Sequence, residues 1–279
     1  MVWKHLTRER LEQTKQHFAS SGYVMQWYAI AMEVVLTTLG PEWWKKNCTT
    51  NPVKPDEFLA LPDDSENSQY NHQDRIIKLG HMLYALKDSN GYDAFLSSLK
   101  TRDLAPTFFE LWVGHILKQN GYEVELIETK GHKGQDYDLS ARKYDITVSV
   151  EAKSRRDGIV LTERTLQNTL QKARKQLPLS GPSIIFVSIP NEWTKINGAE
   201  EVIGKSVSSF LSNANRVNYI VLIWHRWIDL RAGRASASSV RQYQNSNPRT
   251  PAELGQVIKP VEQLVNLDLE QQVFKPSFW

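Results

Sequence analysis

The sequence predicts an α/β protein, with a mixed sheet flanked by helices and an all-helical region before it. Apolar residues recur at helical spacing through most of residues 1–100. From Asp103 onward, helical patterns alternate with short apolar runs of strand length. Within that part, residues 136–153 alternate between apolar and polar side chains, which is typical of half-buried strands. We therefore expect a helical domain of unclear role at 1–100, an α/β core at 101–230, and a basic extension packed on that core at 231–279.

The first hundred residues are predicted to contain helices joined by polar loops. Residues 7–38 have helical spacing with an interruption near Ser20–Gly22, and Gly40-Pro41 ends the pattern. Residues 47–73 are rich in Pro, Asp, Asn and Ser, which predicts a loop. Further helices are predicted at 74–86 and 92–99.

The α/β part is predicted to run in the order α-β-β-β-α-β-α-β. Its first three strands are expected to be antiparallel, whereas the last two are reached through helical crossovers. A glycine-bearing loop is expected at 129–135, a polar turn at 141–145, and a short strand or helix at 257–269. The predicted helices are 105–119, 161–177 and 199–212, and the predicted strands are 122–128, 136–140, 146–153, 183–189 and 217–224.

The hairpin formed by the second and third strands gathers three charged side chains. On the third strand, Glu151 and Lys153 point away from the apolar face that Val148 and Val150 form. Asp138 lies on the neighbouring strand and is expected close to both charged residues. Two carboxylates and an ammonium, on a sheet whose other face is buried, predict a site for a hard cation beside a positive charge.

The composition excludes several classes of protein. Of 279 residues, 41% are apolar and 23% charged, as in ordinary globular proteins. No apolar run approaches the roughly 18 residues of a membrane span, and charged residues crowd the N-terminus where a signal peptide is apolar. The single cysteine, Cys48, leaves no internal disulfide and no cysteine zinc site. We therefore expect a cytoplasmic protein with no membrane partner.

Positive charge is concentrated in parts of the chain. Residues 1–100 carry a net charge of −1, whereas residues 129–175 carry +5 and residues 226–249 carry +4. Basic regions around an acidic pocket predict a polyanionic partner such as nucleic acid. A solvated basic surface is the alternative interpretation.

The order of elements and the charged hairpin resemble a known family. An α-β-β-β-α-β order, with Asp138 on the second strand and Glu151-Ala152-Lys153 on the third, is similar to the PD-(D/E)xK nucleases, the restriction-endonuclease-like superfamily. The resemblance covers about residues 103–224, and Tyr137 stands where the family pattern has proline. A second acidic-x-Lys triplet, Glu128-Thr129-Lys130, lacks the strand context of the first.

The resemblance implies a metal site and a catalytic lysine. Asp138, Glu151 and the backbone carbonyl of Ala152 would bind Mg²⁺ (or Mn²⁺), which prefers oxygen ligands and keeps several waters. Lys153 would hold or deprotonate the attacking water, or neutralise developing negative charge. The alternative is a solvated strand face on which Lys153 forms an ordinary salt bridge.

Glu110 is the fourth catalytic candidate. It stands on the helix before the first strand, where many relatives place a glutamate that completes the acidic cluster, and it borders the apolar stripe of that helix. The alternative is a capping box, because Thr107 and Glu110 fit the S/T-x-x-E pattern.

Several basic and amide side chains are candidates for contacts to nucleic acid. Such residues would bind phosphates and give affinity with little sequence information. Ordinary solvated positions are the alternative interpretation. The candidates are Arg155 and Arg156 after the third strand, and Gln171, Lys172 and Lys175 on the helix that follows.

The sequence therefore predicts a Mg²⁺-dependent nuclease that hydrolyses phosphodiester bonds in DNA. An endonuclease of defence or DNA processing is expected, and a homodimer is compatible with it because double-strand cutters of this type use two sites. The alternatives are a non-catalytic nucleic-acid-binding or assembly module, an RNA-directed nuclease, and a purely structural α/β protein.

Overall fold

The computed structural model describes residues 6–48, 58–60, 66–128, 136–155, 157–230, 233–250 and 257. The chain forms two compact units. The described part of the first unit comprises residues up to Asp88 together with Leu96–Leu104, and that of the second comprises Ser89–Phe95 and the chain from Ala105 onward. No helix among the described residues is long and apolar enough to cross a membrane.

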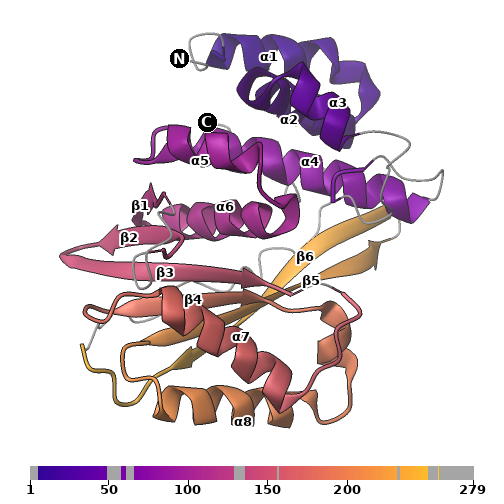
Figure 1. The fold of residues 1–279 in the computed structure, drawn as a ribbon. Coiled ribbons are helices and arrows are strands. Elements are labelled where there is room, and N and C mark those ends of the chain that lie inside the picture. The colour runs from indigo at the N-terminus through magenta and orange to yellow at the C-terminus, as the bar shows by residue number, and fades with distance from the viewer. Residues whose placement is uncertain are drawn as a thin grey trace. The chain divides into compact units, whose positions relative to one another are not determined.

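The first unit is helical (Figure 1). Thr7 caps the first helix by accepting a hydrogen bond from the Arg10 backbone N–H at 3.2 Å. Gly22 and Gly40, with φ of 81° and 92°, separate successive helices at backbone angles that favour glycine. The elements up to residue 99 are α1 (Arg8–His17), η2 (Ala19–Ser21), α2 (Tyr23–Leu39), α3 (Pro41–Asn47), α4 (Glu66–Leu86) and α5 (Tyr92–Leu99).

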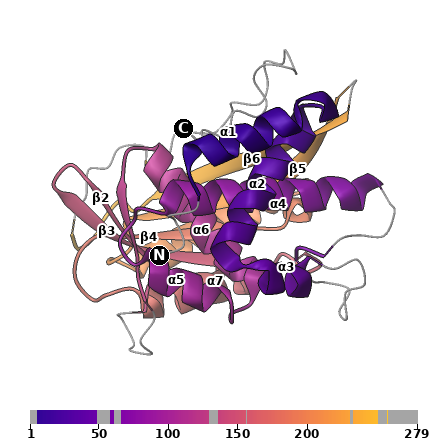
Figure 2. The ribbon, with the colours of Figure 1, turned by 90° about the horizontal axis from the view of Figure 1, so that it is seen from above.

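Helices α2 and α4 cross in close contact (Figure 2). Gly80 of α4 lies so near α2 that a Cβ built on it would be 2.6 Å from the Cα of Ala31. A side chain at position 80 would therefore meet backbone, which cannot move aside easily.

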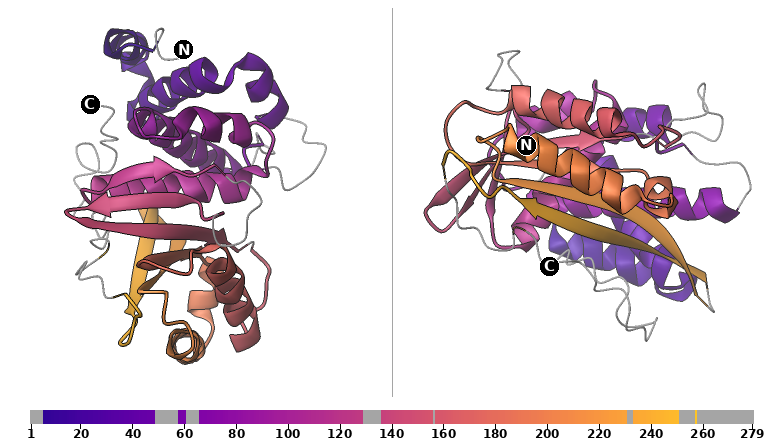
Figure 3. Two further views of the ribbon diagram at one scale, coloured as in Figure 1. Left: turned by 60° about the vertical axis from the view of Figure 1, so that its left-hand side comes forward. Right: turned by 90° about the horizontal axis from the view of Figure 1, so that it is seen from below.

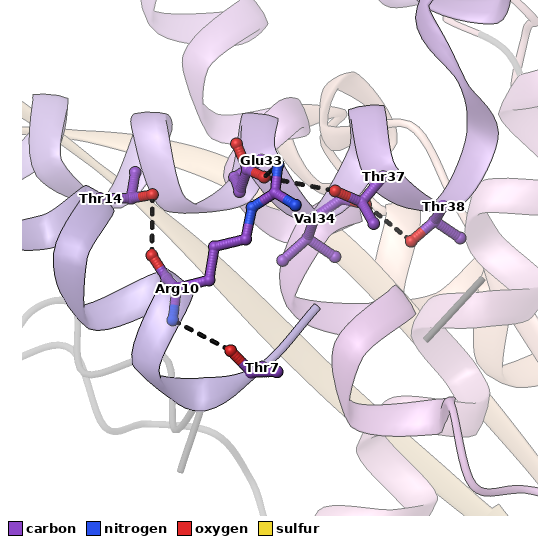
Figure 4. A network of polar contacts seen from close by, with 7 residues as sticks. All are labelled: Thr7, Arg10, Thr14, Glu33, Val34, Thr37 and Thr38. Carbon is purple, nitrogen blue, oxygen red and sulfur yellow. Dashed lines mark hydrogen bonds and ion pairs between the residues drawn. The ribbon is translucent and has the colours of Figure 1, made fainter. Parts of the chain in front are cut away.

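Polar contacts connect α1 to α2 and continue along α2 (Figure 4). Arg10 forms a 2.5 Å ion pair with Glu33, which also accepts a 3.3 Å hydrogen bond from the Thr37 hydroxyl. One residue along, the Thr38 hydroxyl donates to the Val34 carbonyl at 2.6 Å. Since the Arg10 side chain is 48% exposed, the ion pair contributes at most about 1 kcal/mol, and apolar packing must hold the helices together.

The second unit is built on a six-stranded mixed sheet in the order β1-β2-β3-β4-β5-β6. Strands β1 to β3 are antiparallel, β3 to β5 are parallel, and β6 is antiparallel to β5. Helices α6 and α7 lie on opposite faces of this sheet (Figures 1 and 3). The strands are β1 (Glu123–Leu126), β2 (Leu139–Lys143), β3 (Ile146–Ser154), β4 (Ser183–Ser188), β5 (Tyr219–Leu230) and β6 (Gly233–Gln244), and the helices are α6 (Leu104–Gln119), α7 (Glu163–Gln176), η3 (Asn191–Lys195) and α8 (Ala199–Ser212).

Strand register decides which face each side chain occupies. Ile185 and Val187 of β4 belong to the buried cluster formed with α7 and α8. Glu151 pairs with Ile185 and Lys153 with Val187, so both charged residues lie on the α7 face. Val148, Val150 and Ala152 alternate with them and are buried on the opposite face.

The predicted α/β class with its α-β-β-β-α-β order is confirmed, and so are most of the elements. Helix α8 has the predicted bounds, and α6 and α7 differ from the predicted ranges by at most two residues at either end. The predicted loop at 47–73 is too long, because α4 begins at Glu66 rather than at residue 74. The predicted loop at 129–135 and all but Val257 of the segment 257–269 lie outside the described residues.

The hairpin turn is shorter than predicted. The pattern indicated a turn at 141–145, but β2 continues to Lys143 and only Tyr144 and Asp145 form the turn, with φ of 54° at Tyr144. Strand β2 continues because Ala141 is buried and paired with Val148. At its other end, β2 starts at Leu139. Asp138, which was predicted to lie on the strand, immediately precedes it.

Strand β6 was not predicted from the sequence. Strand β6 pairs with β5, which continues to Leu230 rather than ending at the predicted residue 224. It occupies residues that were expected to form an extension packed on the core. Its sequence, GRASASSVRQYQ, has only small and polar residues over most of its length. Its backbone hydrogen bonds to β5 hold it in the sheet, and such bonds leave no signal in a hydrophobicity pattern.

Candidate active site

The paired ends of β2 and β3 bring Asp138 and Glu151 together. The printed pairing of β2 with β3 ends at Leu139 opposite Val150, and Asp138 lies just before it, close enough to Glu151 for its side chain to act on the pKa of that residue. The backbone N–H of Asp138 still donates to the Val150 carbonyl, at 3.1 Å. Asp138 is therefore held as firmly as a strand residue although it precedes the strand.

The Asp138 carboxylate is fixed by the backbone of β3. Its Oδ2 accepts a 2.7 Å hydrogen bond from the Ala152 N–H, and only 8% of the residue is exposed. In an extended strand the N–H and C=O of one residue point to the same side. The carbonyl of Ala152 therefore faces the Asp138 side of β3, as the predicted ligand set requires.

Glu151 is fully buried, and its environment opposes ionisation. Burial raises the pKa of Glu151 to about 7, although the Lys153 ammonium and the neighbouring Asp138 side chain act to lower it. Its Oε1 forms an ion pair with Nζ of Lys153. Its Oε2 is buried and receives no hydrogen bond from any described residue. A buried carboxylate oxygen without a donor is costly, and a cation would compensate it.

Glu110 approaches the same carboxyl group from α6. The residue is 4% exposed, and its charge contributes to raising the pKa of Glu151. The capping-box interpretation is wrong, because α6 begins at Leu104 and Thr107 lies buried inside the helix. Glu110 is thus a buried acid near the pair rather than part of a helix cap.

The donor set fits a hard divalent cation that keeps part of its water shell. Within the described ranges, no three His, Cys, Asp or Glu side chains are grouped to hold a metal ion. The protein would therefore offer two carboxylates and one backbone carbonyl. Mg²⁺ is commonly bound through one or two carboxylates plus water and phosphate oxygens, and the uncompensated Oε2 of Glu151 is where such an ion would be stabilising.

Arg155 ties the end of β3 to α7. Its Nε donates to the Thr169 hydroxyl at 2.5 Å and its NH2 group donates to the Thr165 carbonyl at 3.2 Å. Its backbone N–H donates to Ser188 at 2.9 Å, and burial lowers the pKa of its guanidinium. These contacts make Arg155 a support for the strand that carries Lys153. The predicted phosphate contact by Arg155 stays a prediction, and Arg156 lies outside the described residues.

The candidates on α7 lie on different sides of the helix. Thr169 contacts Arg155, and Gln176 donates to the Asp136 carbonyl at 3.3 Å. Lys172 is three residues after Thr169 and four before Gln176, so it lies on the same side of the helix as these two residues. The residue is exposed, which makes it the best placed of the α7 candidates.

Gln171 faces another direction. Gln167 and Arg174 donate to Ser209 and Asn213 at the α8 end of the packing. Gln171 is four residues after Gln167 and three before Arg174, and therefore lies on the α8 side of α7. Lys175 is exposed. Contacts of Gln171 and Lys175 with nucleic acid stay predictions.

Two supporting residues were missed in the sequence. Thr169 and Gln176 look like ordinary polar helix positions, and only the folded arrangement shows that they hold Arg155 and the segment before Asp138. Tyr137, which replaces the proline of the family pattern, packs against the cluster between the sheet and α7–α8. An aromatic anchor here restrains the chain next to Asp138.

The part of the chain that carries the candidate site is similar to a known protein family. The family described as Mrr_cat, restriction endonuclease, matches residues 101–177. These residues contain α6, β1 to β3 and α7, and with them Glu110, Asp138 and Glu151-Ala152-Lys153. None of the curated proteins searched matches the chain. Residues 101–177 of this chain thus match a restriction endonuclease family of the PD-(D/E)xK, restriction-endonuclease-like superfamily, which confirms the predicted resemblance.

Proposed function

We propose that the protein is a divalent-metal-dependent nuclease that hydrolyses phosphodiester bonds in DNA as an endonuclease. The family match supports nuclease activity. The observation that carries the proposal is that Asp138, which accepts a hydrogen bond from the Ala152 N–H, lies close to the buried Glu151, whose Oε1 contacts Lys153. We keep defence or DNA processing in the cytoplasm as the expected setting, with a homodimer for cleavage of both strands.

The acidic residues and Lys153 have different roles in the proposed reaction. Asp138, Glu151 and the Ala152 carbonyl would hold Mg²⁺ or Mn²⁺, with Glu110 adding negative charge nearby. When bound, the ion supplies a polarised phosphate and a more acidic water. Lys153, with a side chain 27% exposed, reaches from the buried carboxylate toward solvent. Its ammonium is placed to orient the attacking water and to stabilise negative charge developing on the phosphate.

Incubation with supercoiled and linear DNA, with Mg²⁺ or with EDTA, tests the proposal. We expect nicking or linearisation only with the metal, and a loss of at least about 100-fold in D138N, E151Q and K153A. The control is R142A, because Arg142 is an exposed arginine paired with Glu123 at the far end of the hairpin. Unchanged cleavage in all three site variants would rule out this site, and faster cleavage of a matched RNA would favour the RNA-directed alternative. Salt-sensitive DNA binding without hydrolysis in either metal would favour the binding-module alternative.

A further inference from the structure

The last two strands continue past the rest of the sheet. Strand β4 pairs with β5 only over Tyr219–Ile223, whereas β5 and β6 pair over all twelve residues of each strand. Residues 224–230 and 233–239 therefore form a two-stranded ribbon, with which no third strand pairs among the described residues (Figures 1 and 3). Seven residues of strand are roughly 20 Å long.

The ribbon leaves the sheet at the edge where the candidate site lies. Strands β3, β4 and β5 are parallel, and Lys153 is in register with Val187, which is in register with Leu222. Arg226 lies four residues beyond Leu222, and alternation places it on the face that carries Glu151 and Lys153. Two strand spacings and four residues of rise separate Arg226 from Lys153 by about 15 Å.

Both faces at the base of the ribbon are anchored to the domain. Trp224 packs against the α7–α8 cluster. On the other face, the His225 ring stacks on Trp112 of α6, with centroids 4.4 Å apart, and contacts the Ser238 hydroxyl at 3.0 Å. These contacts fix the direction of the ribbon with respect to the strands that carry the site.

The site-facing side of the ribbon presents an available positive charge. Arg226 is exposed and lies opposite the small residue Ala237, and no described residue forms an ion pair with it. Arg241, farther down the same face, instead pairs with Glu200 at 2.5 Å. Residues 224–244 contain four arginines and one aspartate, a net charge of +3.

We propose that this ribbon is an arm that binds the phosphate backbone of duplex DNA while the neighbouring site cleaves it, an inference that rests on the proposed function. The major groove of B-form DNA is wide enough for a two-stranded β-ribbon, whereas that of an A-form RNA duplex is deep and narrow. The separation of about 15 Å corresponds to between four and five nucleotides along one strand. Arg226 would therefore bind a phosphate a few nucleotides from the bond that is cut.

The test is binding of the full-length chain to a fluorescent DNA duplex in EDTA, where no cleavage occurs, at several salt concentrations. Loss of one phosphate contact in R226A should reduce the slope of log affinity against log salt by about 0.9. The affinity advantage of the wild type over R226A should then shrink about threefold when salt is raised about fourfold. R226E should bind more weakly than R226A, R226K should recover most of the affinity because a point charge suffices for phosphate, and R142A should bind like the wild type.

Cleavage in Mg²⁺ is measured separately, so the two proposals can fail separately. Equal affinity and slope in the wild type, R226A and R226E would overturn the arm while leaving the nuclease intact. Binding that depends on Arg226 without hydrolysis would support the arm and overturn the nuclease. If R226A or R226E differs from the wild type in oligomeric mass in solution but binds DNA equally well, the arm would be overturned in favour of an interface between copies of the chain. A larger effect of R226E on RNA duplex than on DNA would also contradict it.

Discussion

Glu151 is an acid in surroundings that disfavour its own charge, and this has a measurable consequence for stability. Its folded-state pKa is about 7, against an ordinary value of 4.5. Between these values the folded chain binds more protons than the unfolded chain. In the absence of metal, stability from this group is therefore fully present near pH 4.5, falls as the pH rises to about 7, and is constant above that. The loss is at most about 3 kcal/mol.

We therefore expect E151Q to be more stable than the wild type at pH 8 in EDTA, and the advantage to shrink at pH 5. A neutral amide of the same shape removes the cost of burying the charge. Urea unfolding at the two pH values measures the difference, and comparison with E163Q, at the exposed start of α7, corrects for general charge effects. Equal stability of E151Q and the wild type at both pH values would contradict the raised pKa.

Most of the site could be predicted at the level of residues. Alternation along 146–153 placed Glu151 and Lys153 on one face, and the hairpin placed Asp138 near them. The full burial of Glu151 could not be predicted, because alternation along a strand does not reveal which helices pack over each face. The hydrogen bonds from Arg155 to Thr165 and Thr169 of α7 could not be predicted either, and the phosphate contact predicted for Arg155 stays a prediction.

At the level of elements, predictability follows the hydrophobic signal. Helix α8 and strand β4 have strong apolar patterns and were located within a residue. The start of α4 at Glu66 and the whole of β6 were missed, because their sequences are polar and they are held by neighbouring elements or by backbone pairing. The predicted helical core of the first hundred residues also depends on a feature that no periodicity reveals, the close approach at Gly80.

Substitution of this glycine gives a test of the α2–α4 crossing. The Cβ of G80A would meet the Ala31 backbone at 2.6 Å, so we expect a destabilisation of about 1–3 kcal/mol despite the better helix propensity of alanine. G204A in α8 is the matched control, since no atom lies within 4 Å of its Cβ position. That variant should be more stable by up to about 1 kcal/mol. Urea unfolding compares them, and an equal gain in both variants would contradict the close crossing.

For the whole molecule, the important feature is the division into two compact units, only one of which carries the candidate site. Apolar packing between helices maintains the first unit, whereas the second places a buried, partly uncompensated carboxylate pair at the end of β2 and β3. Chains with more than one unit commonly unfold in several steps. A ligand that binds only one folded unit stabilises that unit by mass action.

We therefore expect calorimetry in EDTA to show two unfolding transitions, of which Mg²⁺ raises only one. At a metal concentration of about 100 times the dissociation constant, the gain in that unit is about 2.7 kcal/mol. D138N should abolish the gain while leaving both transitions in EDTA nearly unchanged, because an amide oxygen can still accept the hydrogen bond from Ala152. G80A should lower the other transition and leave the response to Mg²⁺ intact. A gain from Mg²⁺ that survives in D138N would place the cation elsewhere, and G80A lowering both transitions equally would show that the units unfold as one.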